Sequence, residues 1–165
     1  MNRKKFVFFL LFFIIMVNAI FLFFKPEILG NSFLDVIHEQ EFENGFVTKV
    51  IDGDTIVING ESVRLLGMDT PERGEKCYSE STQRLKELVL NKDVLLESDV
   101  TDKDQYKRLL RYVFIEENGE RTNVNILLVQ EGFATARFYE DRKYRNEILV
   151  AEKEARENNI GCKWS

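Results

Sequence analysis

The chain contains two stretches whose hydrophobic patterns differ in kind. Residues 6–24 form an almost unbroken run of Phe, Leu, Ile and Val, whereas apolar and polar residues alternate or recur at helical spacing from residue 43 onward. A helix of about 19 residues reaches roughly 28 Å, enough to cross the hydrocarbon core of a bilayer. Because no amphipathic pattern interrupts the run, a helix buried in a globular core does not account for it. We therefore expect residues 6–24 to contact lipid, within an N-terminal transmembrane anchor or signal sequence at residues 1–25.

The flanks of this run leave both alternatives open. Arg3, Lys4 and Lys5 precede it, which favours a cytoplasmic amino terminus and places the rest of the chain outside. Val17 and Ala19 have the small size that a signal peptidase wants, although cleavage there would expose a Phe-rich stub. The protein is expected to be membrane-anchored with its domain extracytoplasmic, or secreted if the segment is cleaved.

Residues 26–41 are predicted to be a linker, because Pro and Gly residues break any long helix there. His38, the only histidine of the chain, lies in this linker. A histidine without neighbouring partners is normally solvated, so we expect neither a His-based catalytic triad nor a zinc site. This excludes several classes of hydrolase.

The remaining pattern, at residues 42–165, predicts one α+β domain. Five short strands are expected at 46–51, 55–58, 61–66, 94–97 and 109–115, and three helices at 79–90, 123–131 and 140–158. Asn59-Gly60 between the second and third strands is a strong hairpin signal. Five strands with a helix inserted after the third indicate a small Greek-key barrel of the OB type.

Finer expectations concern the helices and the segment between the last two. Gly132 is expected to end the second helix, and residues 133–139 to be extended. The apolar stripe of the first helix contains Ser81, Leu85, Leu88 and Val89, and that of the third contains Leu149 and Ala155.

Charge and cysteine content add two constraints. Without Arg3, Lys4, Lys5 and Lys25, the chain has 19 basic and 28 acidic residues, a net charge of −9. Such a domain has no general attraction for polyanions, so any nucleic-acid chemistry needs local positive charge and a metal. Cys77 and Cys162 could close one long disulfide loop in an exported domain, or remain free thiols. No protein partner is implied, and a monomer is the default expectation.

The densest chemistry lies between Val50 and Glu72. This stretch holds Asp54, Asp69 and Glu72 together with Arg64. Two carboxylates, a backbone carbonyl and waters form an oxygen-only shell that suits Ca²⁺. The alternative is that both aspartates only cap turns. In an ideal hairpin Arg64 pairs with Thr55 and faces away from Asp54, so a bulge or barrel curvature must turn one of them.

Hydrolysis of a phosphodiester needs a base, a cation and donors for the extra charge of the transition state. Glu72 follows a proline in a loop and could deprotonate a water. Arg64 offers one fork-shaped donor, and Arg108 is a candidate for a second. Because Lys107 and Arg111 lie beside Arg108, chemistry alone does not single it out.

Four separated blocks resemble the staphylococcal nuclease (thermonuclease) family: I-D-G-D-T at 51–55, R-L-L-G-M-D-T-P-E at 64–72, D-x-Y-x-R-x-L-x-Y at 104–112 and the final G-C-K-W-S. The resemblance covers roughly residues 43–165. It implies an OB-fold, Ca²⁺-dependent endonuclease that cleaves DNA and RNA. Matched position by position, it implies calcium ligation by Asp54, Asp69 and the Thr70 carbonyl. The implied catalytic residues are Arg64, Glu72 and Arg108.

The resemblance also implies a nucleotide-contacting tyrosine at Tyr106, and a second at Tyr139 or its neighbour Phe138. Two features depart from the family pattern. Lys107 and Leu109 flank Arg108 where the family can have glycines, and the basic surface of the family is missing. Two other functions remain open at this point: a non-catalytic OB module that binds nucleic acid or protein, and an anchored domain that uses calcium only for stability.

Overall fold

The computed structural model of the protein describes residues 42–165. The predicted anchor at 6–24 and linker at 26–41 lie outside this part of the chain, so both stay predictions. From residue 42 to the carboxyl terminus, no helix combines the length and apolar character needed to cross a membrane.

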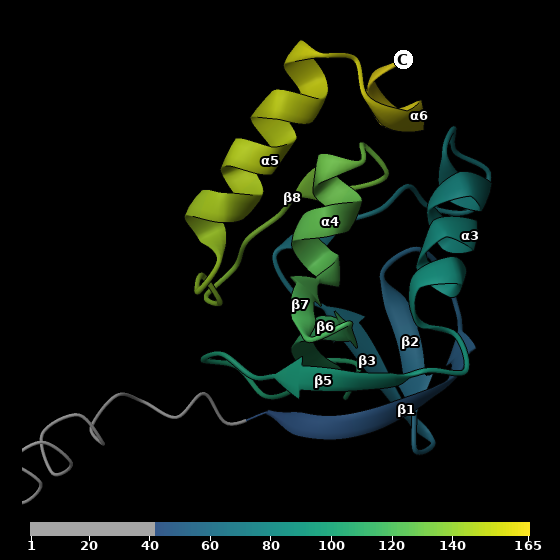
Figure 1. Ribbon diagram of the computed structural model, residues 1–165, viewed down its shortest axis with the longest axis vertical. Helices are drawn as coiled ribbons and strands as arrows, with labels where there is room; N and C mark the ends of the chain where they lie inside the picture. The colour runs from purple at the N-terminus through teal and green to yellow at the C-terminus, as the bar shows by residue number, and fades with distance from the viewer. Residues whose placement is uncertain (1–41) are drawn as a thin grey trace, which may run out of the picture. The chain divides into compact units, whose positions relative to one another are not determined.

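Five strands close into a barrel (Figure 1). They are β1 (Glu43–Val50), β2 (Thr55–Ile58), β3 (Glu61–Leu65), β5 (Asp93–Glu97) and β6 (Leu109–Glu117). Their order is β3-β2-β1-β5-β6, and β6 returns to pair in parallel with β3. All other barrel pairings are antiparallel. The α+β class and the five-stranded OB-type barrel expected from the sequence are therefore confirmed.

The β2–β3 hairpin has the predicted register. Ile58 pairs with Glu61 and Thr55 with Arg64, so Asn59 and Gly60 form a two-residue turn. Their φ angles are 51° and 85°, as a type I′ turn requires at both central positions. The positive angles explain why this dipeptide predicted the hairpin correctly.

Three short strands were not predicted as strands, although one of them, at Thr135–Ala136, lies within residues 133–139, which were expected to be extended. β4 (Met68–Asp69) pairs with β8 (Thr135–Ala136), and β7 (Glu120–Asn123) extends β6 as a hairpin. A two-residue strand is too short to show a period of alternation, because that signal needs at least four residues. The β4–β8 pairing places Asp69 opposite Thr135, a residue far downstream in the sequence.

The described part of the chain has four helices rather than three. They are α3 (Tyr78–Val89), α4 (Val124–Gln130), α5 (Arg145–Glu157) and the short α6 (Gly161–Trp164). The Asn123 side chain caps α4 by accepting hydrogen bonds from the backbone N–H groups of Asn125 and Ile126. Gly132 follows α4 with a φ of 69°, as expected at this end. The prediction that the last long helix begins at residue 140 is wrong, because α5 starts at Arg145.

The helices pack on the barrel through the faces that the sequence indicates, with one exception. Figure 1 shows α3, α4 and α5 side by side over one end of the barrel. Every residue of the α3 stripe is buried: Ser81, Leu85, Leu88 and Val89. On α5 the buried side chains are Ile148, Ala151 and Ala155. Leu149 is 37% exposed, so its placement on the apolar face was wrong by one position.

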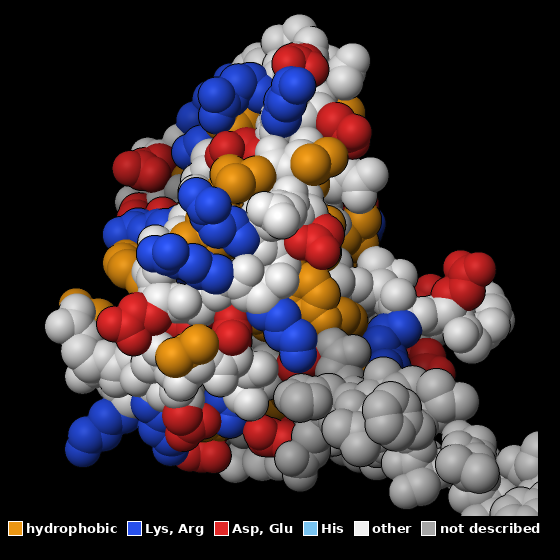
Figure 2. Space-filling model, turned by 90° about the vertical axis from the view of Figure 1, so that its left-hand side faces the viewer, with side chains coloured by type: hydrophobic (Ala, Val, Ile, Leu, Met, Phe, Trp, Pro, Cys, Tyr) orange, Lys and Arg blue, Asp and Glu red, His pale blue; other side chains and the backbone are white. Residues whose placement is uncertain are grey.

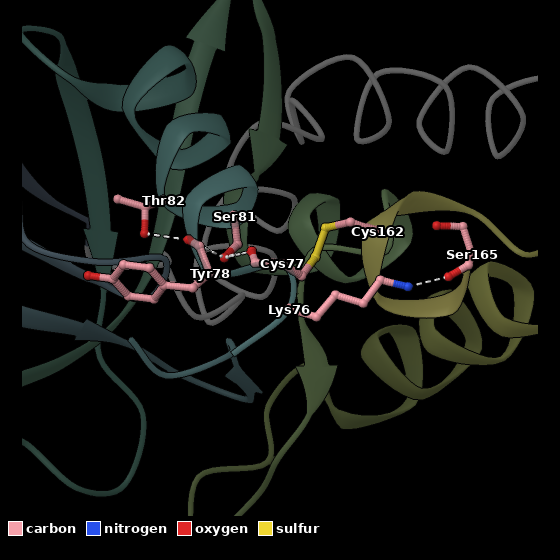
Figure 3. The surroundings of a disulfide bond; sticks show 7 residues. All are labelled: Lys76, Cys77, Tyr78, Ser81, Thr82, Cys162 and Ser165. Atoms are coloured by element: carbon pink, nitrogen blue, oxygen red, sulfur yellow. Dashed lines mark hydrogen bonds between the residues drawn. A yellow bond between two sulfur atoms is a disulfide. The ribbon is translucent and has the colours of Figure 1, made fainter. Parts of the chain in front are cut away.

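A disulfide joins the start of α3 to the carboxyl-terminal α6 (Figure 3). The Cα atoms of Cys77 and Cys162 are 5.4 Å apart and 85 positions separate the two residues. The Lys76 ammonium group also donates to the Ser165 carbonyl oxygen. The last residues of the chain are therefore held against the amino-terminal end of α3.

Candidate active site

A pocket of about 820 Å³ opens between three segments of the chain. They are the end of β3 with β4, the loop between β5 and β6, and the segment after β8. Six residues that the sequence singled out line it: Arg64, Asp69, Glu72, Tyr106, Arg108 and Tyr139. Asp54 and Thr70 are only 5% and 6% exposed and lie behind the pocket wall. The structure thus gathers residues from across the domain around one cavity.

The Arg64 guanidinium bridges two carboxylates. Its Nη1 donates to Asp54 Oδ1 at 2.5 Å, and its Nη2 donates to Asp69 Oδ1 at 2.6 Å. Arg64 still pairs with Thr55 in the hairpin. Asp54, however, lies in the turn before β2, where successive side chains need not alternate between the two faces of the sheet. The register problem raised by the sequence disappears for this reason.

Burial and ion pairing act in opposite directions on these groups. For Arg64, burial disfavours the charged form, but Asp54 and Asp69 outweigh it and raise the guanidinium pKa. For Asp54, burial is the larger effect, so its pKa is raised although Arg64 opposes the rise. Burial of this carboxylate therefore disfavours its charged form more than Arg64 favours it.

The backbone around Asp54 is packed closely enough to require glycine. A Cβ atom on Gly53 would lie 2.8 Å from Thr70 Oγ1 and 2.9 Å from Ser81 Oγ. Thr70 in turn donates its backbone N–H and its hydroxyl to Asp54 Oδ2, at 3.3 and 3.2 Å. This contact fixes the turn that carries Asp54 against the segment that carries Asp69.

Arg108 is positioned by Asp104, four residues earlier in the same loop. Asp104 Oδ2 accepts from Arg108 Nε at 2.7 Å, and Oδ1 accepts from the backbone N–H groups of Arg108 and Tyr106 at 3.0 and 2.9 Å. Arg108 Nη1 also lies 3.4 Å from Thr55 Oγ1, which donates to Asp54. Arg108 and Arg64 consequently belong to one network. Lys107 has a φ of 65°, the left-handed conformation that suits the glycine found there in the family pattern.

Glu72 is exposed and lines the pocket. Its backbone N–H donates to Glu75 Oε2, whereas no hydrogen bond or ion pair within residues 42–165 uses the Glu72 carboxylate. An unpaired carboxylate at the mouth of a pocket that also presents two guanidinium groups can accept a proton from water.

Two exposed tyrosines stand at the pocket, each beside an arginine. Tyr106 is 71% exposed and Tyr139 is 65% exposed. The guanidinium carbon of Arg108 is 5.5 Å from the Tyr106 ring centroid, and that of Arg137 is 5.5 Å from the Tyr139 centroid. Open aromatic faces next to cations are the features with which proteins hold single-stranded nucleic acid.

The two loops that carry these tyrosines are joined by hydrogen bonds from backbone N–H groups to aspartate side chains. Asp99 Oδ2 accepts from the N–H groups of Arg142 and Lys143 at 2.8 and 2.9 Å. Asp141 Oδ1 accepts from the Thr101 N–H at 2.9 Å. Because each loop contributes both donors and acceptors, these bonds hold the two walls of the pocket against each other.

Sequence reasoning missed Asp104 and Arg137. Asp104 belongs to the D-x-Y-x-R-x-L-x-Y block, and the available signal was an aspartate at the start of a polar turn, where its side chain can accept from backbone N–H groups that follow it. Arg137 donates through Nη1 to Asp69 Oδ2 at 2.8 Å. It lies 68 positions from Asp69, and nothing local in the sequence indicates this contact.

The donor atoms of the site fit a hard cation. Asp54 and Asp69 each direct one carboxylate oxygen at the Arg64 guanidinium, and each oxygen keeps lone pairs beyond those used by the arginines. Within residues 42–165 no three or more His, Cys, Asp or Glu side chains form a metal cage. A cation here would complete its shell with a backbone carbonyl and waters, which Ca²⁺ accepts more readily than zinc does.

Comparison with known proteins agrees with this geometry. The family model described as staphylococcal nuclease homologue matches residues 62–165. The chain belongs to the staphylococcal nuclease family. The matched range includes Arg64, Asp69, Glu72 and Arg108 and begins after Asp54.

Three relatives show how much of the chain the similarity covers. An uncharacterized protein of Methanocaldococcus jannaschii is 32% identical over 164 residues, covering 82% of this chain and 79% of its own. The thermonuclease of Staphylococcus intermedius is 38% identical over 129 residues, covering 72% and 74%. The micrococcal nuclease of Shigella flexneri is 36% identical over 132 residues, covering 73% of each chain. The similarity to members of the staphylococcal nuclease family therefore extends over most of both chains.

Proposed function

We propose that the protein is a Ca²⁺-dependent nuclease that hydrolyses phosphodiester bonds of DNA and RNA by attack of a water molecule. The observation that carries the proposal is the shared pocket, which brings one unpaired carboxylate, Glu72, to the same cavity as Arg64 and Arg108. Relatives named thermonuclease and micrococcal nuclease support the reaction class.

Each residue has a distinct task in this proposal. Glu72 holds the attacking water and takes its proton. Arg64 and Arg108 donate to the phosphate oxygens as charge develops on them in the transition state. Asp104 orients Arg108 through the Nε hydrogen bond at 2.7 Å, so the guanidinium is in place before the substrate arrives.

The metal ligands in the proposal are Asp54, Asp69 and the Thr70 carbonyl. When bound, Ca²⁺ polarises the phosphoryl group and offsets its negative charge. The chain contributes the fixed spacing of the two aspartates, because Arg64 donates to both of them and Thr70 fixes the Asp54 turn.

Substrate binding in the proposal relies on Tyr106 and Tyr139. Their exposed rings can stack on bases of any identity, which suits an enzyme that accepts both DNA and RNA. We further propose that the enzyme acts outside the cytoplasm, anchored in the bilayer through residues 6–24 or secreted, on nucleic acid that reaches the cell surface. This location rests on the N-terminal sequence pattern alone.

The test is digestion of single-stranded and double-stranded DNA and of RNA by the full-length protein in mild detergent. We expect cleavage with Ca²⁺ and none with a chelator. Absence of Ca²⁺-dependent cleavage of all three substrates would contradict the enzyme proposal. Nucleic-acid binding without cleavage would instead identify a non-catalytic binding module.

Two variants separate the proposed roles. Glu72→Ala should lower turnover and leave Ca²⁺ binding nearly intact, because its carboxylate contacts none of the proposed metal ligands. Asp54→Ala should weaken Ca²⁺ binding itself. Calorimetric titration with Ca²⁺ distinguishes the two, and an equal loss of calcium affinity in both variants would refute the division.

A further inference from the structure

Both carboxylate oxygens of Asp69 accept from arginines. Oδ1 accepts from Arg64 at 2.6 Å, and Oδ2 accepts from Arg137 at 2.8 Å. A cation that takes Asp69 as a ligand must therefore share this carboxylate with two guanidinium groups or displace one of them. Since a cation and a guanidinium repel each other, the second outcome is favoured wherever one arginine can move away.

Arg137 is the arginine that can move. The Arg64 side chain is 17% exposed and also donates to the buried Asp54, whereas the Arg137 side chain is 51% exposed and Asp69 is its one carboxylate partner within residues 42–165. An exposed ion pair contributes little to stability, so leaving Asp69 costs Arg137 little. If Arg64 left Asp54, a buried carboxylate would lose its charge partner, so this movement has a much larger cost in free energy.

The backbone of Arg137 stays in place while its side chain can turn. Its N–H donates to the Gly67 carbonyl at 2.9 Å, directly after the two-residue strand β8. The guanidinium lies 5.5 Å from the Tyr139 ring and lines the pocket. Released from Asp69, it remains tethered at the pocket wall that carries the tyrosine.

We propose that Arg137 couples Ca²⁺ binding to nucleic-acid binding. Without metal, Arg137 pairs with Asp69. When Ca²⁺ binds Asp69, the Arg137 side chain leaves this carboxylate. It then contacts a second phosphate of the substrate, next to the scissile phosphate that Arg64 and Arg108 hold. This inference rests on the proposed function and adds a residue and a substrate feature to it. By linkage, Ca²⁺ and a polynucleotide with two adjacent phosphates strengthen each other's binding through Arg137.

Surface charge explains why a second phosphate is the expected partner. The face that includes α5 carries Lys and Arg side chains interspersed with Asp and Glu (Figure 2), so no uniformly basic surface guides a polyanion there. Attraction of the substrate then depends on individual Lys or Arg side chains that are not paired with a carboxylate when the phosphate arrives. A guanidinium is suited to phosphate because its planar fork matches two phosphate oxygens.

The experiment is a calorimetric titration of the full-length protein with Ca²⁺, alone and with short oligothymidylates whose phosphorothioate linkages resist cleavage. A dinucleotide has one linkage and a trinucleotide has two. For the wild type we expect Ca²⁺ to bind tighter in the presence of the trinucleotide than of the dinucleotide. For Arg137→Gln we expect Ca²⁺ alone to bind about two- to fivefold tighter, the range that an exposed ion pair supports, and the advantage of the second linkage to fall to less than twofold.

Two further variants serve as controls. Lys153→Gln removes one positive charge from α5 and should behave as the wild type, because Lys153 is 72% exposed and, among residues 42–165, its one ion pair is with Glu157 at 3.9 Å. Arg137→Lys keeps the charge but loses the fork, so Ca²⁺ affinity should stay near that of the wild type while the effect of the second linkage shrinks.

The inference is overturned if Arg137→Gln matches Lys153→Gln in both measurements, or if it weakens Ca²⁺ binding. These results are distinguishable from failure of the proposed function. A wild type that cleaves DNA with Ca²⁺ while Arg137→Gln binds like Lys153→Gln refutes the coupling alone. A wild type that neither binds Ca²⁺ nor cleaves DNA refutes both.

Discussion

Asp104 allows the positioning of Arg108 to be tested apart from the shape of its loop. One oxygen, Oδ1, accepts from the two backbone N–H groups of Tyr106 and Arg108, and the other, Oδ2, accepts from Arg108 Nε. Asp104→Asn can keep its carbonyl oxygen at the Oδ1 position and place its NH₂ group against the Nε–H, so only the guanidinium bond is lost. Asp104→Ala loses all three bonds.

The magnitudes follow from the bonds removed. The Asp104 and Arg108 side chains are 17% and 27% exposed, so we expect Asp104→Asn to lower the free energy of unfolding by about 1–2 kcal/mol and Asp104→Ala by about 2–3 kcal/mol. Displacing a catalytic group by about 1 Å costs up to roughly 100-fold in rate. We therefore expect kcat to fall about 10- to 100-fold in both variants, with Ca²⁺ affinity unchanged.

The stability effect should depend on pH in a defined direction. Burial alone raises the pKa of Asp104, but the hydrogen bonds from Arg108 outweigh it and lower the pKa below its usual value of 3.8. A carboxyl group with a lowered folded-state pKa stabilises the fold above its unfolded-state pKa, and this contribution is lost as the pH falls through the folded-state value. Urea unfolding of Asp104→Asn and wild type should differ at pH 7 and converge in acid below pH 3.8.

A double-mutant cycle completes the test. In an Arg108→Ala background, Asp104→Asn should change kcat by less than about twofold, because the group that it positions is gone. If Asp104→Asn keeps wild-type turnover, or loses as much turnover without Arg108 as with it, then Asp104 does not act through Arg108.

Three other predictions follow from the described residues. Asp54→Asn, measured with a chelator, should lose stability relative to the wild type as the pH falls from 7 toward 3.8 in urea unfolding, because burial raises the Asp54 pKa and the folded wild type takes up a proton there that the amide cannot; a stability difference that does not change with pH would contradict this, and calcium affinity should drop. Replacing Cys77 and Cys162 together by Ser should lower stability by about 3–4 kcal/mol in urea unfolding, given the 85-residue separation, with near-normal kcat at 25 °C because neither cysteine lines the pocket. Lys107→Gly should raise the midpoint of thermal unfolding through a gain of about 0.5–1 kcal/mol, because Lys107 has a φ of 65°; an unchanged or lower midpoint would show that the lysine side chain offsets the strain.

The parts of the fold that sequence predicts well are those set by local physics. The Asn59-Gly60 turn requires two positive φ angles, and that dipeptide supplies them. The stripe on α3 is correct because period 3.6 persists over twelve residues. Arg64, Asp69 and Glu72 come from one continuous stretch, and the hairpin alone brings Arg64 near Asp54.

The parts that sequence predicts poorly are those decided by contacts between distant segments. Residues 140–144 have a composition compatible with a helix, yet the N–H groups of Arg142 and Lys143 donate to Asp99 instead. These bonds join residues that are 43 and 44 positions apart in the sequence. Because of them, α5 begins only at Arg145. Arg137 reaches Asp69 only because β8 pairs with β4, and neither two-residue strand leaves a periodic signal.

Charge balance connects the buried aspartate, the two arginines and the substrate proposed for this site. Asp54 and Asp69 carry two negative charges, and Arg64 and Arg137 carry two positive ones, so the group is neutral as a unit. Taking up Ca²⁺ leaves an excess of two positive charges, which two phosphodiester groups neutralise. Of these two arginines Arg137 is the more exposed, so once Ca²⁺ has taken its place at Asp69, its guanidinium is the one left for a second phosphate to pair with. Arg137 therefore binds a second phosphate more strongly after the metal has bound than before, as the proposed coupling requires.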